Sequence, residues 1–102
     1  MQDGFEFEVK GITYDAKSMR TSMLIETGDI LDYRRESTNV YDPFAIEILY
    51  NETRLGYVPR EFAKLIAVEI DINAAKYSIT VLKWMDRTNW DAIHVRMEKI
   101  ST

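Results

Sequence analysis

The sequence predicts a mainly β fold, a small antiparallel barrel of about six strands with one or two helices. Several short segments alternate apolar and polar side chains with a period of two, which is typical of half-buried strands. One longer segment, residues 59–73, instead repeats its apolar side chains at helical spacing. A short chain of mostly antiparallel strands tends to close on itself, because closure removes exposed sheet edges.

The predicted strands share this alternation and are bounded by turn residues. In the first, Phe5, Phe7 and Val9 alternate with charged side chains, so one face should be buried. In the third, residues 44–50 likewise predict one clearly apolar face. A polar turn at residues 51–53 then predicts a hairpin. The predicted strands are residues 5–13, 30–34, 44–50, 54–58, 76–85 and 90–100.

The predicted helix follows directly after the hairpin. Pro59 suits the first helical position, where its missing N–H costs nothing, and residues 71–73 should end the helix. Residues 15–26 give mixed signals, so we expect a helical turn or a loop there. The helical side chains expected to face the core are Phe62, Leu65, Ile66 and Ile70.

Composition limits the classes of function. With 102 residues, the chain is expected to form one domain, residues 1–102. It has no Cys and one His, so disulfides and a Cys/His zinc site are excluded, and we expect no cofactor. The net charge of −4 argues against a broad basic surface that coats nucleic acid, so any such contact must be local. No segment resembles a leader or a membrane span, and we expect a cytoplasmic protein.

The polar connection at residues 37–43 is the first candidate for a binding site. It crowds Asn39, Tyr41 and Asp42 between two predicted strands. Asn, Asp and Pro are common turn residues, and an Asx turn is the simpler explanation of Asp42 before Pro43. An aromatic ring beside a carboxylate in a loop can also be a recognition surface. Both interpretations stay open on these residues alone.

Two runs of residues resemble the HIRAN domain family, a module of helicase-like DNA-repair factors and of short bacterial proteins. They are Arg-Glu-x-x-Asn-x-Tyr-Asp-x-x-Ala-Ile at residues 35–46 and Leu-Gly-Tyr-Val-Pro-Arg at residues 55–60. The resemblance covers roughly residues 8–82 and implies an OB-like barrel. It also implies binding of single-stranded DNA at a free 3′-hydroxyl end, and a helicase or repair protein as a candidate partner.

The resemblance assigns roles to individual residues. Tyr41 and Asp42 match the family's Tyr-Asp pair, and Asn39 matches its upstream Asn. Terminal bases would stack on aromatic rings, and the aspartate would meet the terminal hydroxyl. Tyr14 matches the family's aromatic residue after the first strand, and Tyr57 stands where the family has a His.

Other matching positions concern the phosphates. Arg60 replaces a family Lys and keeps its charge, and Arg35 or Lys64 would assist it. Thr13 replaces a basic residue, which removes one phosphate contact, and Phe44 replaces an Asn. We expect no catalytic residues and no metal ligands.

Alternatives to DNA binding come from the same residues. The groove could take a peptide or a chain terminus, which suits the acidic composition. Glu36 with Asp42 could hold a divalent ion for nuclease chemistry, although solvated acids explain the pair more simply. The tyrosines could be half-buried residues at the barrel rim. Trp84 and Trp90 are expected to pack at a hairpin end or to add a stacking surface, and His94 receives no role.

Overall fold

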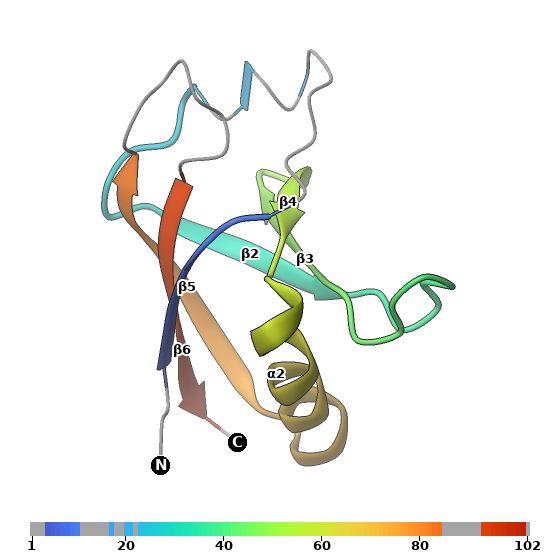
Figure 1. Ribbon diagram of the computed structural model, residues 1–102. Helices are drawn as coiled ribbons and strands as arrows, with labels where there is room; N and C mark the ends of the chain where they lie inside the picture. Colours follow the sequence, from blue (N-terminus) through green and yellow to red (C-terminus); the bar gives the residue numbers. More distant parts are fainter. Residues whose placement is uncertain (1–3, 11–16, 18–19, 22, 85–92, 102) are drawn as a thin grey trace.

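The computed structural model describes residues 4–10, 17, 20–21, 23–84 and 93–101 of the chain. In these residues, six antiparallel strands form one curled sheet in the order β1-β6-β5-β2-β3-β4, and helix α2 lies on its inner side (Figure 1). This arrangement, a curled half-barrel, confirms the predicted mainly β fold. The elements are β1 (Gly4–Glu8), β2 (Ile30–Arg35), β3 (Ile46–Tyr50), β4 (Thr53–Tyr57), α2 (Arg60–Asn73), β5 (Lys76–Trp84) and β6 (Ile93–Ser101).

The two edge strands of the sheet meet at one backbone bridge. The Lys10 N–H donates to the Tyr57 carbonyl at 2.9 Å, and the Tyr57 N–H donates to the Lys10 carbonyl at 2.6 Å. Gly56 makes this approach possible, because a Cβ there would overlap the Lys10 carbonyl and lie 2.7 Å from Val9 Cγ1. The absence of a side chain at this corner therefore lets the two edges join.

The strand predictions hold with small shifts. Phe5, Phe7 and Val9 are buried as expected. β3 begins at Ile46 rather than at residue 44. Its expected apolar face is confirmed, because Ile46 and Ile48 are fully buried, and the opposite face is buried as well. Its Glu47 is only 2% exposed. The reason is that neighbouring strands on both sides bring arginine side chains over the outer face of β3.

The β3–β4 hairpin turns on two residues. Asn51 and Glu52 have positive φ angles of 49° and 66°. A two-residue turn with positive φ matches the right-handed twist of the strands it connects. β5 and β6 pair antiparallel and confirm the predicted closing hairpin. Its turn, including Trp90, lies outside the described residues, as does much of the predicted helical turn at residues 15–26.

Helix α2 was predicted nearly in full. It begins at Arg60, with Pro59 just before it, and ends at Asn73 as expected. Ile66 is fully buried, and Phe62 packs its ring 5.3 Å from that of Phe5, centroid to centroid. Leu65 was wrongly expected in the core. It is 57% exposed.

The position of Leu65 follows from which helical face is buried. The buried residues of α2 are Ala63, Ile66 and Ala67, with Ile70 partly buried beside them. These positions lie three and four apart, so they form one stripe. Two of them are alanines, a residue type that periodicity of large apolar side chains does not reveal. No helix in the described part of the chain is long and apolar enough to cross a membrane.

Candidate nucleic-acid interface

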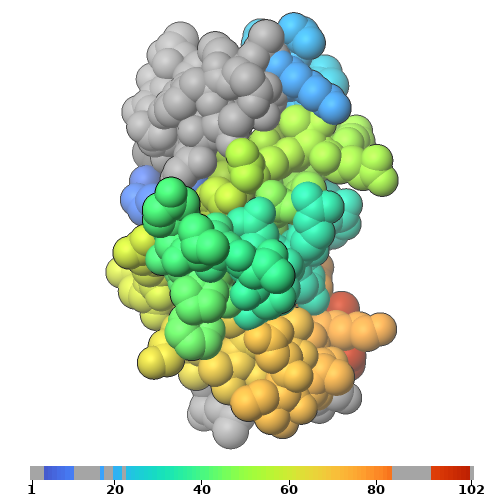
Figure 2. Space-filling model, turned by 90° about the vertical axis from the view of Figure 1, so that its right-hand side faces the viewer, coloured from blue at the N-terminus to red at the C-terminus, as the bar shows by residue number. Residues whose placement is uncertain are grey.

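A pocket of about 460 Å³ opens where the loop at residues 36–45 faces the end of β4 and the start of α2. Figure 2 shows this loop, in green, standing out from the surface beside the start of α2, in yellow. Five of the eight predicted site residues line the pocket, although they come from separate parts of the sequence. The lining residues are Lys10, Asn39, Tyr41, Asp42, Ala45, Tyr57, Val58, Pro59, Arg60 and Glu61.

Asn39 shapes the loop from within. Its Oδ1 accepts hydrogen bonds from the backbone N–H groups of Tyr41, at 2.9 Å, and Asp42, at 3.1 Å. Its Nδ2 donates to Glu36 Oε1 at 3.2 Å. A short side chain that bonds its own backbone in this way holds a turn in one conformation. Asn39 therefore sets the positions of the two residues that follow it.

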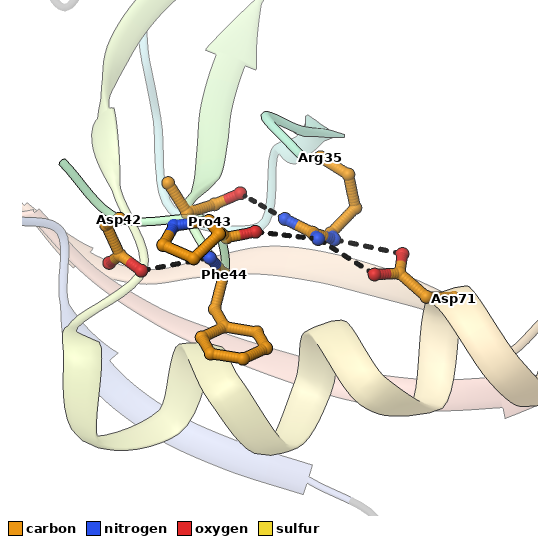
Figure 3. Close-up of polar contacts among 6 residues, drawn as sticks. Arg35, Asp42, Pro43, Phe44 and Asp71 are labelled. Atoms are coloured by element: carbon orange, nitrogen blue, oxygen red, sulfur yellow. Dashed lines mark hydrogen bonds and ion pairs between the residues drawn. The ribbon is translucent and has the colours of Figure 1, made fainter. Parts of the chain in front are cut away.

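The two carboxylate oxygens of Asp42 have different partners, one within the loop and one in the pocket. Oδ1 accepts a hydrogen bond from the Phe44 N–H at 2.9 Å, which is the Asx turn that the sequence left open (Figure 3). Oδ2 lies 3.7 Å from Arg60 Nε. The side chain is 22% exposed. The carboxylate thus stabilises the loop with one oxygen and faces the cationic side of the pocket with the other.

The two tyrosines of the pocket differ in exposure. Tyr41 is 89% exposed, so its ring is open to a solute. Tyr57 is half-buried, and its hydroxyl accepts a hydrogen bond from Arg54 Nη1 at 2.9 Å. Burial raises the pKa of the Tyr57 phenol, and a hydrogen bond with Glu36 adds to the increase against the charge of Arg54. Tyr57 therefore stays neutral and keeps its hydroxyl proton at physiological pH.

The structure does not bring Arg35 and Lys64 into the pocket. Arg35 bonds the carbonyls of Pro43 and Ala45 and the carboxylate of Asp71 (Figure 3). The Lys64 ammonium lies 5.5 Å from the centroid of the Phe44 ring, within cation–π range. The role predicted for Tyr14 concerns a residue outside the described ranges, as does the change at Thr13.

Lys10 is a pocket residue that sequence reasoning missed. Its side chain is 59% exposed and lies 3.6 Å from a Glu8 oxygen. Strand alternation alone predicts only that Lys10 points outward, as it does for several other charged residues. Only the bridge to Tyr57 brings it to the pocket, across a sequence separation that no local pattern spans. With Lys10 and Arg60 against Asp42 and Glu61, the charges of the lining residues balance.

The carboxylates considered for a metal are engaged elsewhere. Glu36 accepts a hydrogen bond from Asn39, and Asp42 bonds Phe44 and faces Arg60. Among the residues that the structure describes, no group of three or more His, Cys, Asp or Glu side chains could hold a metal ion. His94 lies 3.0 Å from a Glu8 oxygen, on the strand pair β1–β6.

The half-barrel and its lateral pocket define a small β module with an open groove between a loop and a helix start. The chain belongs to the HIRAN domain family, whose model matches residues 3–96. No curated protein matches the chain.

Two solved structures share this architecture. The crystal structure of the HIRAN domain of human HLTF is 18% identical, with a TM-score of 0.73, covering 94% of this chain and 74% of that chain. The crystal structure of a protein from Lactobacillus plantarum is 22% identical, with a TM-score of 0.76, covering 99% of this chain and 94% of that chain. At these identities the likeness establishes the fold.

Proposed function

We propose that this domain is a nucleic-acid-binding module whose pocket takes the 3′ end of single-stranded DNA. The observation that carries the proposal is the position of Tyr41, Asp42 and Arg60 around one opening. An exposed ring, a carboxylate and a guanidinium are the groups needed to hold a base, a hydroxyl and a phosphate. Family membership supports the same class of ligand.

Stacking supplies affinity that does not depend on base identity. Every base has a π-face, and stacking on an aromatic side chain is worth roughly 1–3 kcal/mol per base. Tyr41 is exposed enough to accept a base without rearrangement. Tyr57 also lines the pocket and carries a neutral hydroxyl.

Asp42 supplies the preference for an end. Its Oδ2 can accept a hydrogen bond from a terminal hydroxyl, and a charge-assisted bond of this kind is worth about 1.5–3 kcal/mol. A terminal phosphate would instead bring like charge to the carboxylate. Arg60 lies next to this oxygen and would hold the phosphate that precedes the last nucleotide.

The test compares two oligonucleotides of the same sequence, one ending in a 3′-hydroxyl and one in a 3′-phosphate, by fluorescence anisotropy. The wild type should bind the hydroxyl end more tightly. Asp42→Asn keeps an oxygen for the Phe44 N–H and removes the charge, so it should narrow the difference between the two ends. Equal wild-type affinity for both ends would eliminate the role given to Asp42.

A second pair of variants isolates stacking. Tyr41→Ala should weaken binding of both oligonucleotides about tenfold or more, because it removes one stacking surface. Tyr41→Phe keeps the ring and serves as the matched control. If Tyr41→Ala binds as tightly as Tyr41→Phe, the ring does not contact a base.

A peptide or chain terminus is the second candidate ligand, favoured by the balanced charge of the pocket and by Val58 and Pro59 in its wall. The dependence of binding on added salt distinguishes a DNA ligand from a peptide ligand. DNA binding should weaken steeply with salt because counterions are released, whereas an apolar peptide contact should not.

We propose a binding role rather than catalysis, with a helicase or repair protein as the partner that the family suggests.

A further inference from the structure

One row of side chains crosses the outer face of the sheet and ends at the pocket. Arg34 of β2 lies opposite Glu47 of β3, which lies opposite Tyr57 of β4, which in turn bridges to Lys10. Directly opposed residues of antiparallel strands place their side chains on the same face. Tyr57 and Lys10 line the pocket, so the row leads from the pocket back across three strands.

Arg54 joins this row through an irregularity in the sheet. In β4, Arg54 and Tyr57 are three residues apart, and regular alternation would place them on opposite faces. The β3–β4 register shifts between Ile48 and Leu49, so that Arg54 pairs with Leu49 while Tyr57 pairs with Glu47. Both now lie on the outer face. The Arg54 guanidinium lies 5.6 Å from the centroid of the Tyr57 ring.

A buried carboxylate holds the two arginines in place. The Glu47 side chain is 3% exposed, with Oε1 in contact with Arg34 Nη2 and Oε2 3.7 Å from Arg54 Nη1. A buried carboxylate requires cationic partners, because it has lost its hydration. Both arginines stay partly open to solvent: the side chain of Arg34 is 67% exposed and that of Arg54 is 43% exposed.

We infer that Arg34 and Arg54 form a second subsite, for the backbone phosphates of the nucleotides that lead into the pocket. This inference rests on the proposed function. The guanidinium fork matches phosphate oxygens in geometry and charge. Arg54 contacts both the ring and the hydroxyl of Tyr57. The nucleotide before the terminal one, placed at Tyr57, would therefore bring its own 5′ phosphate beside Arg54, while the phosphate of the terminal nucleotide stays at Arg60.

The same arrangement gives the bound strand a direction. The 3′ terminus lies in the pocket, and the upstream backbone crosses the sheet from β4 towards β2. Neighbouring acids limit the subsite to these arginines. Asp32 and Glu52 line one hollow together with Arg34, and Glu36 raises the pKa of Tyr57 at the pocket side. Phosphate contacts are therefore local, as the acidic composition requires.

The test measures the salt dependence of binding for two ligands with free 3′-hydroxyls, a dinucleotide and a strand of ~12 nucleotides. The variant replaces all three charges, as Arg34→Gln, Glu47→Gln and Arg54→Gln together, so that no buried carboxylate is left without its partners. For the long strand, the variant should lose affinity, and the slope of log K against log salt should decrease by about one per phosphate contact removed. Dinucleotide binding should stay unchanged.

The control is Lys76→Gln, which removes the same net charge from an exposed position at the start of β5. It should leave both ligands and the salt slope unaltered. If the wild type binds both ligands and the triple variant binds the long strand normally, the second subsite is refuted while the pocket stands. If the wild type binds neither ligand, the proposed function fails and this inference fails with it.

Discussion

Arg35 and Asp71 form a bidentate ion pair between β2 and the last turn of α2. Arg35 Nη2 donates to Asp71 Oδ2 at 2.8 Å, and Nε donates to Oδ1 at 3.0 Å. The same guanidinium donates to the carbonyls of Pro43, at 3.0 Å, and Ala45, at 2.8 Å (Figure 3). One side chain therefore ties the end of the pocket loop to the helix. Its position explains why Arg35 is a positioning residue outside the pocket.

The first prediction concerns Asp71→Asn. Losing this charge should weaken the hold of Arg35 on the loop, so the Phe44 amide, which bonds Asp42, should exchange its hydrogen faster in native-state NMR. The loss of global stability should be small, about 1 kcal/mol or less, because Asp71 is 45% exposed on its side chain.

The matched control for that variant is Glu69→Gln on the same helix. Glu69 pairs with Lys99 at 3.5 Å and has no contact with the loop among its described bonds. It should leave the Phe44 amide unaffected. Equal exchange rates in wild type and Asp71→Asn would show that the loop keeps its conformation without this ion pair.

Low pH should remove the stability that the ion pair between Arg35 and Asp71 contributes. The Arg35 guanidinium bonds Asp71 and lowers the pKa of that carboxyl below its usual value of about 3.9. A pKa that is lower in the folded state stabilises the fold above the unfolded pKa, and the contribution is lost as pH falls through the folded pKa. The stability difference between wild type and Asp71→Asn, measured by urea unfolding, should therefore be constant above about pH 5 and shrink below pH 4. A difference that grows towards low pH would contradict this assignment.

Gly56→Ala should destabilise the fold at the closure of the sheet edges. The added Cβ would overlap the Lys10 carbonyl, which is backbone and cannot rotate away. Overpacking of this kind typically costs about 1–3 kcal/mol. Gly28→Ala is the contrast, since a Cβ added at Gly28 would meet nothing within 4 Å and only its φ of 94° disfavours a side chain. Urea unfolding should show the larger loss for Gly56→Ala.

Ala74→Gly should instead stabilise the protein. Ala74 ends α2 in the left-handed conformation, with φ 54° and ψ 33°. Glycine adopts this conformation without the steric cost that Cβ brings, and the gain should be about 0.5–1 kcal/mol. Ala75→Gly is the control, because Ala75 is buried and should lose stability. Thermal unfolding of the two variants should move in opposite directions.

Much of the fold was predictable because it depends on local patterns. Alternating side chains such as Phe5 and Phe7 identified strands, and helical spacing around Ile66 identified α2. Leu65 was wrongly predicted to face the core. The spacing of apolar residues identifies a helix, but it does not show which of two adjacent helical faces is buried. The two alanines of that stripe are too small to produce a strong periodic signal.

The candidate site likewise has a part that local patterns predict and a part that they do not. The loop that holds Tyr41 and Asp42 could be predicted from local residues, because short polar side chains such as Asn39 bond their own backbone. The distant residues that meet this loop are brought there by the folding of the whole chain. The bridge of Lys10 to Tyr57 and the register shift that turns Arg54 outward both arise from strand pairing. Pairing joins residues far apart in the chain, so neither segment by its own pattern shows which partner it will meet.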